Sequence, residues 1–173
     1  IHSHVHRHCG VETLHAPMMF SMKKVSSGVA QSLEEALFNR KLEYSFTESI
    51  FSDLNRNGAG RGELVGGNLS ILYSLLGSNS DIDTTGKILF IEDIDEYLYH
   101  IDRMMLQLKR SGKLKHLKAL VVGGMSDMKD NVVPFGKTAE EIIFDAVKEY
   151  KYPVCFNFPA GHIEKNMAIF LGM

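Results

Sequence analysis

The stretch Lys87-Ile88-Leu89-Phe90-Ile91-Glu92-Asp93 decides the fold. Its apolar run from Ile88 to Ile91 has the length of a strand and is typical of one buried on both faces, as in a parallel sheet. An acidic segment, 92–96, follows the run. Apolar residues then recur at three- and four-residue spacing from Tyr97 to Leu108, which predicts an amphipathic helix that Gly112 ends. A buried strand followed by such a helix is the repeating unit of an α/β layer.

The same order recurs on both sides of this unit. Downstream, the sequence predicts a strand over 117–122, a helix over 138–150 and a strand over 154–158. Upstream, the short glycine-bounded segment 62–67 runs directly into a helix over 68–77. Asn68 and Thr138 are N-cap residues by type, and Glu141 stands at the capping-box position of the later helix. This alternation predicts an α/β fold with a layered mixed or mostly parallel sheet and flanking helices.

The first fifty residues give weaker signals. We expect a short strand over 11–16, a loop from Pro17 through the methionine-rich 18–22, and a strand over 42–50. Between them, Ser32 has the residue type and the spacing to Glu35 of a helix N-cap.

Composition excludes several classes of protein. The net charge of −2 and the pI of about 6.5 give no basic face for nucleic acid. The longest apolar runs fall far short of the roughly 20 residues that span a bilayer. The length of 173 residues suits one ordinary domain. Cys9 and Cys155 are expected to be free thiols in a reducing compartment, because a domain of this size needs no disulfide.

Four histidines, at positions 2, 4, 6 and 8, open the chain. On a strand, this alternation would place all four on one face. Zinc needs three or four convergent ligands held rigidly, and a chain terminus rarely supplies that rigidity. We therefore expect no metal site here, and we interpret the segment as part of a polar helix or as a surface segment.

Two residues are candidates for chemistry. Glu92 stands where a strand ends and a helix begins, a common place for functional side chains in α/β proteins, although an acid there often only stabilises the helix dipole. His162 follows the last predicted strand in Phe158-Pro159-Ala160-Gly161-His162, where proline and glycine fix a tight turn. Its imidazole has the chemistry of a general base, although a histidine on a loop often has no such role.

Glycine-rich passages and serines complete the list of candidates. Gly66-Gly67-Asn68 stands at a helix N-terminus and Gly123-Gly124 follows a strand; each passage either binds a substrate carboxylate through backbone N–H groups or allows close backbone packing. Neither has the spacing of a nucleotide-binding loop. No Gly-x-Ser-x-Gly motif occurs, and neither Ser70 nor Ser126 has the surroundings of a nucleophile.

Taken together, these segments resemble the LD-carboxypeptidase family, which also includes the microcin C self-immunity peptidases. The resemblance covers nearly the whole chain, and its features occur in the order of the family: 12–18 (ETLHAPM), 66–69 (GGNL), 88–93 (ILFIED), 99–103 (YHIDR), 158–162 (FPAGH) and Asn166. The family pattern continues past Asn166 into a glycine and a closing strand, whereas this sequence ends at Met173. That difference leaves the completeness of the sheet open.

The resemblance implies a two-domain serine peptidase of which this chain is the C-terminal part. Glu92 and His162 fall on the glutamate and the histidine of the catalytic triad, and the nucleophilic serine would lie upstream of Ile1. Residues 1–25 would then be a remnant or linker after the nucleophile domain, and 26–173 the C-terminal domain. The chain alone is expected to be inactive, and the start at Ile1 without a methionine agrees with a missing upstream part.

The family also implies a substrate and a location. Its members remove the terminal D-alanine from murein tetrapeptides during peptidoglycan recycling in the cytoplasm, without a cofactor, and homodimers are expected. Gly66, Gly67 and Asn68 are expected to shape the substrate site. Two alternatives stay open: a microcin-type immunity peptidase acting on an acylated peptide nucleotide, and a murein-peptide-binding module without catalysis.

Overall fold

A four-stranded parallel sheet forms the centre of the protein. The computed structural model describes residues 1–18, 26–39, 42–45 and 52–173. The sheet has the order β2-β3-β4-β5, formed by Leu64–Asn68, Ile88–Ile94, Ala119–Ser126 and Val154–Cys155. Strands that follow one another in the sequence are neighbours in the sheet, and each pair is parallel. The predicted α/β fold with a largely parallel sheet is thus confirmed.

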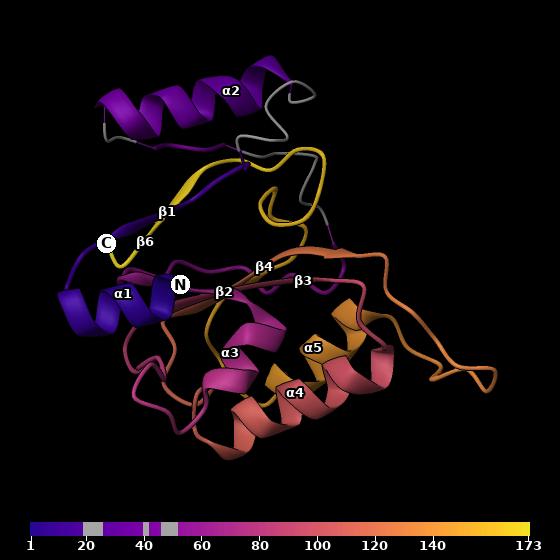
Figure 1. Cartoon of the computed structure of the whole chain (residues 1–173). Helices are drawn as coiled ribbons and strands as arrows, with labels where there is room; N and C mark the ends of the chain where they lie inside the picture. The colour runs from indigo at the N-terminus through magenta and orange to yellow at the C-terminus, as the bar shows by residue number, and fades with distance from the viewer. Residues whose placement is uncertain (19–25, 40–41, 46–51) are drawn as a thin grey trace.

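Three helices connect the strands and cover one face of the sheet (Figure 1). They are α3 (Leu69–Leu75), α4 (Leu98–Arg110) and α5 (Ala139–Val147). Parallel crossovers are right-handed, so a sheet with sequential strand order receives all of its connecting helices on the same face. The main apolar core lies between these helices and the sheet, with Leu89 and Ile91 from β3 against the stripe Ile101, Met104, Met105 and Leu108 of α4.

The opposite face of the sheet packs against the two ends of the described chain. β1 (Thr13–His15) and β6 (Ile169–Leu171) form an antiparallel ribbon above it (Figure 1). Phe90, whose side chain alternates with those of Leu89 and Ile91 along β3, forms a second small core there with Ala160, Ile169 and Leu171. A strand does follow Asn166, at Ile169–Leu171, but it pairs with β1 and not with the four-stranded sheet.

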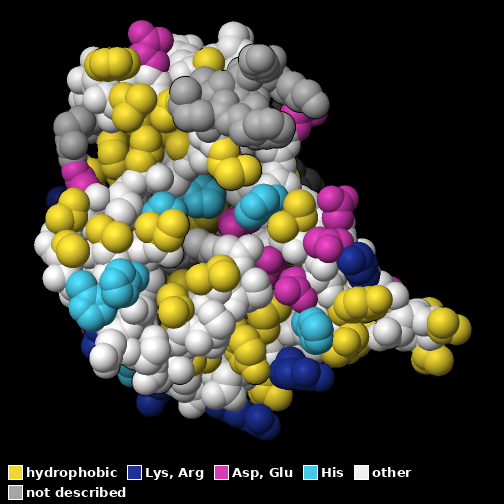
Figure 2. Space-filling model, viewed as in Figure 1, with side chains coloured by type: hydrophobic (Ala, Val, Ile, Leu, Met, Phe, Trp, Pro, Cys, Tyr) yellow, Lys and Arg dark blue, Asp and Glu magenta, His cyan; other side chains and the backbone are white. Residues whose placement is uncertain are grey.

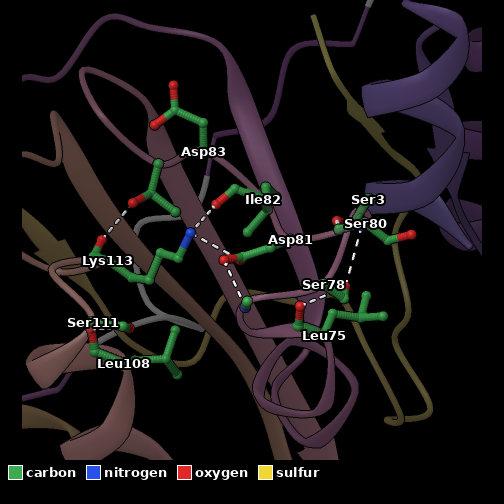
Figure 3. A network of polar contacts seen from close by, with 12 residues as sticks. Ser3, Leu75, Ser78, Ser80, Asp81, Ile82, Asp83, Leu108, Ser111 and Lys113 are labelled. Carbon is green, nitrogen blue, oxygen red and sulfur yellow. Dashed lines mark hydrogen bonds and ion pairs between the residues drawn. The ribbon is translucent and has the colours of Figure 1, made fainter.

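The histidine-rich segment is a helix, α1 (His2–Cys9), one of the two interpretations that the sequence allowed. Polar contacts join it to the loop before β3: Ser3 Oγ and the Arg7 guanidinium donate to the carbonyls of Ser80 and Asp81. The same loop is tied to the end of α4, because Lys113 Nζ lies 2.8 Å from Asp81 Oδ1 and donates to the Ile82 carbonyl (Figure 3). Helical spacing separates the four histidines into two pairs on different sides of α1.

Several local predictions were wrong. The helix α2 begins at Ser27 and ends at Glu34, with Ser26 as N-cap, and continues as a π-helical turn, η2 (Glu35–Asn39). Ser32 is inside this helix and not its cap; its hydroxyl donates to the Val29 carbonyl and accepts from the Ala168 N–H. Residues 42–45 are not in a strand, and the rest of the strand predicted over 42–50 lies outside the described residues.

Two strands are shorter than expected. The predicted strand over 11–16 is confined to Thr13–His15, the length over which β6 pairs with it. The predicted strand over 154–158 ends at Cys155, because Asn157 has a φ of 57° and cannot continue an extended chain. No helix among the described residues has the length and apolar character needed to cross a membrane.

Candidate active site

Glu92 lies in the middle of the sheet and not at a helix start. It is the fifth residue of β3, which continues to Ile94, and α4 begins only at Leu98. The interpretation of Glu92 as a helix-dipole residue is therefore wrong. Its side chain is on the same face of β3 as Phe90, away from the three helices, and is 1% exposed.

A loop after β5 brings His162 over Glu92. Two backbone hydrogen bonds hold this loop on β4: Phe158 N–H donates to the Val122 carbonyl, and Gly124 N–H donates to the Ala160 carbonyl. A third closes the loop on itself, from the Met167 N–H to the Pro159 carbonyl. The Gly161 N–H donates to Asn166 Oδ1 at 2.9 Å. The two ends of the turn are thus fixed on either side of the histidine.

Glycines make this close approach possible. A Cβ on Gly123 would lie 2.4 Å from the Ala160 carbonyl oxygen, and one on Gly124 would lie 2.4 Å from Ile163 Cγ2. The close-packing interpretation of Gly123-Gly124 therefore fits the structure. Gly161 has a φ of 107°, and a Cβ there would lie 2.8 Å from Glu92 Cβ and 2.9 Å from Glu92 Oε2. The absence of a side chain at Gly161 leaves room for the carboxylate.

Glu92 and His162 form a carboxylate–imidazole pair. The distance from His162 Nδ1 to Glu92 Oε2 is 2.7 Å, and the His162 backbone N–H donates to the same oxygen at 3.2 Å. An ionised carboxylate only accepts, so Nδ1 carries the proton and Nε2 is left with a free lone pair. The imidazole is 46% exposed over a carboxylate that is 1% exposed. This arrangement points an imidazole toward solvent in the geometry that a general base requires.

His162 borders a cavity of about 530 Å³. Gly161 and His162 form one side of it, and another is formed by His15, at the end of β1, with Pro17 and Met18 after it. Figure 2 shows histidine side chains beside a hollow in this face of the molecule, with acidic side chains nearby. The volume suits a small ligand or part of a peptide.

His15 belongs to this site, although the sequence analysis gave it no role. Its ring packs edge-on against Phe90, with 5.3 Å between centroids. Burial lowers the pKa of the His15 imidazole; the charge of Glu92 raises it and that of His162 lowers it further. The sequence pointed to His15 only through its place in the segment 12–18, one of the features of the family resemblance. A strand pattern does not reveal which distant loop a side chain contacts.

The segment Gly66-Gly67-Asn68 lies beside the site, at the carboxyl end of β2. Asn68 is paired in register with Glu92 and, as predicted, caps α3 by accepting from the Ile71 N–H. Its amide nitrogen also donates to Asp93. A Cβ on Gly66 would lie 1.9 Å from the Phe90 carbonyl oxygen, so close packing of β2 on β3 accounts for that glycine. The role of these three residues toward a substrate stays a prediction.

In the part of the chain that the structure describes, the pair has neither a metal-type cluster of ligands beside it nor a hydroxyl or thiol hydrogen-bonded to its imidazole. No group of three or more His, Cys, Asp or Glu residues there has the arrangement of a metal site. No serine, threonine or cysteine side chain among those residues hydrogen-bonds to His162, which contacts Glu92 instead. The thiols of Cys9 and Cys155 are both free.

The fold and site define an α/β protein with a carboxylate–histidine pair at the carboxyl end of a parallel sheet. Residues 61–173 match the LD-carboxypeptidase C-terminal domain family, and the chain belongs to that family. Over 181 aligned residues it is 35% identical to a probable murein peptide carboxypeptidase of Bacillus subtilis (strain 168), covering 99% of this chain and 54% of that protein.

Solved structures agree with this assignment. The crystal structure of a muramoyltetrapeptide carboxypeptidase from Oxalobacter formigenes superposes with a TM-score of 0.81 at 28% identity, covering 99% of this chain and 58% of that one. A structure of the microcin C7 self-immunity protein gives 0.76 at 20% identity, covering 99% and 59%, which shows a shared fold. The chain thus spans a little over half the length of these proteins.

Proposed function

We propose that this chain is the C-terminal part of a serine LD-carboxypeptidase that releases the terminal D-alanine from murein tetrapeptides. The observation that supports this best is the 2.7 Å contact between His162 Nδ1 and Glu92 Oε2, which leaves Nε2 free at the edge of the cavity. Family membership and the names of the similar proteins from Bacillus subtilis and Oxalobacter formigenes support the choice of substrate.

In the proposed mechanism, a serine upstream of Ile1 supplies the nucleophile. Its hydroxyl attacks the carbonyl carbon of the scissile amide while His162 Nε2 accepts the proton. His162 then returns that proton to the leaving amine of D-alanine, and the C–N bond breaks. Water, deprotonated by the same nitrogen, hydrolyses the resulting acyl-enzyme and regenerates the serine. Glu92 holds the imidazole in the required tautomer and stabilises its charged form.

The segment Gly66-Gly67-Asn68 forms a neighbouring wall of the proposed substrate site. Its support is the register that places Asn68 beside Glu92. Of the two glycines, Gly67 has the more open Cβ position, since a Cβ there would meet only a His2 ring carbon at 3.9 Å, but its φ of 135° strains any other residue, so the melting temperature is measured together with the kinetics. Gly67→Ala is expected to change KM or kcat for the tetrapeptide. If both constants and the melting temperature stay unchanged, these residues have no substrate role.

The proposed reaction is the processing of recycled wall fragments in the cytoplasm. It is tested by incubating the intact protein, with its natural upstream sequence, with a murein tetrapeptide and detecting D-alanine by mass spectrometry. A His162→Gln variant is the matched control, because it removes the base. Release by the parent and loss in the variant are expected.

An acylated peptide nucleotide in a parallel reaction separates the alternatives. Hydrolysis of that compound without D-alanine release would replace the proposal with the microcin-type activity. Binding of the tetrapeptide without cleavage of either compound would replace it with a binding module.

A further inference from the structure

His15 is the one titratable side chain of the cavity, besides His162, that also lies within electrostatic reach of Glu92. It comes from β1, far from both in the sequence, and its backbone is fixed by pairing with Ile169 of β6. Its ring packs edge-on against Phe90, two residues before Glu92 on the same face of β3. Three separate segments therefore converge on one carboxylate.

One ring nitrogen of His15, the buried Nε2, makes no hydrogen bond within the described part of the chain. A buried polar atom left without a partner destabilises the folded protein. An aromatic hydrocarbon would pack against Phe90 without this cost. The choice of an imidazole here therefore points to a role in the site.

We propose that His15 is a positioning residue for the Glu92–His162 pair. Its neutral ring forms the polar wall behind Glu92, so that the carboxylate keeps its charge and directs it to His162 Nδ1. The inference rests on the proposed function for its kinetic part.

Glu92 favours the charged form of His15, and the other influences on its pKa favour the neutral imidazole. Burial lowers the pKa of His15, and His162 lowers it further by repulsion, whereas Glu92 raises it. On the α1 side, the His2 ring lies 5.7 Å away, and burial lowers the pKa of His2 to about 4. A neutral His15 does not compete with His162 for the carboxylate. A protonated His15 would be a second cation beside it.

Two substitutions separate the proposed role from simple packing. His15→Phe keeps a flat ring against Phe90 but removes both nitrogens, and His15→Gln keeps a neutral polar group. His116→Gln is the control, because His116 is exposed and precedes β4 at the amino end of the sheet. Kinetics are measured on the intact protein with the murein tetrapeptide.

For His15→Phe we expect kcat to fall about 10- to 100-fold with KM nearly unchanged, since small displacements of a catalytic group have effects of this size. The acidic limb of the kcat/KM profile, which reports protonation of the base His162, should move to lower pH, because a hydrocarbon neighbour disfavours the charged carboxylate that stabilises the imidazolium. His15→Gln should recover most of the rate and the original limb. The proposal is overturned if the turnover of His15→Phe stays within twofold of the parent and the acidic limb of its kcat/KM profile does not move.

A second measurement does not depend on hydrolysis. The titration of His15 is followed by NMR in the parent and in Glu92→Gln. Loss of the anion should lower the pKa of His15, because Glu92 raises it in the parent. If the protein releases no D-alanine, the proposed function is wrong. The NMR titration still shows in that case whether Glu92 and His15 interact electrostatically. An unchanged His15 titration in Glu92→Gln overturns the inference.

Discussion

Glu92 and Asp93 are neighbours in β3, and each is about 1% exposed, yet their side chains lie on opposite faces of the sheet. Glu92 contacts a half-exposed imidazole on a loop. Asp93 points to the helical face, where it accepts from Asn68 Nδ2 at 2.8 Å and from the Ser70 backbone N–H at 2.9 Å. Burial raises the pKa of Asp93, and the hydrogen bonds from Ile94, Asn68 and Ser70 oppose that effect.

The difference shows that burial alone does not identify a catalytic carboxylate. The partners of Asp93 are a capping side chain and backbone N–H groups, none of which can move a proton near neutral pH. Glu92 has one partner that can, and a cavity in front of it. Asp93 therefore stabilises the start of α3, whereas Glu92 orients the base in the proposed mechanism, and substitutions should separate the two roles.

The largest effect is expected for Glu92→Gln in the intact protein. An amide in place of the carboxylate favours the wrong imidazole tautomer, and loss of the corresponding aspartate in serine proteases lowers kcat by about four orders of magnitude. D-alanine release is the measurement, with circular dichroism to confirm the fold. Turnover near that of the parent would exclude the triad role of Glu92.

Asp93→Ala should instead lower stability. The change leaves Asn68 Nδ2 and the Ser70 N–H without their acceptor, for a loss of about 2–3 kcal/mol in the free energy of unfolding. Urea denaturation measures this loss. Glu149→Ala, which removes an exposed partner of Lys109, is the control and should change little. If Asp93→Ala abolished kcat while stability stayed the same, the assignment of roles to the two carboxylates would be reversed.

A smaller effect is expected for Gly161→Ala, which alters the site from the loop side. The added methyl would lie 2.9 Å from Glu92 Oε2, so we expect kcat to fall about 100-fold through displacement of the pair. Gly136→Ala is the matched control, because Gly136 also has a positive φ, 82°, but open space at the Cβ position. Equal loss of kcat in both variants would mean that backbone strain, and not the contact with Glu92, is responsible.

The smallest effect concerns His2 of α1 and the pH dependence of stability. The pKa of His2 is lowered from 6.5 to about 4 by burial, so the unfolded chain binds more protons than the folded one between these values. The free energy of unfolding should therefore fall as the pH decreases from about 6.5 to about 4. His2→Gln should flatten this dependence, whereas His8→Gln, at an exposed position, should leave it unchanged. Thermal denaturation across the pH range tests both.

The sequence indicated the parallel layer well because its signals are local. The apolar run 88–91, the stripe of α4 and the caps Asn68 and Thr138 each depend on neighbours a few residues apart. The first fifty residues were harder, because their structure depends on distant partners. β1 has the length of its pairing with β6, and Ser32 is buried against Ala168.

By itself, the sequence determined the α/β alternation and singled out Glu92 and His162 by their places after strands and by family resemblance. Only the tertiary structure decided that the two meet, since 70 residues separate them and the loop must cross the sheet over Gly123 and Gly124. It also decided that Glu92 lies inside the strand and that His15 stands beside it. Strand alternation predicts on which face of the sheet a side chain lies. The register and packing of distant segments determine which residues it contacts there.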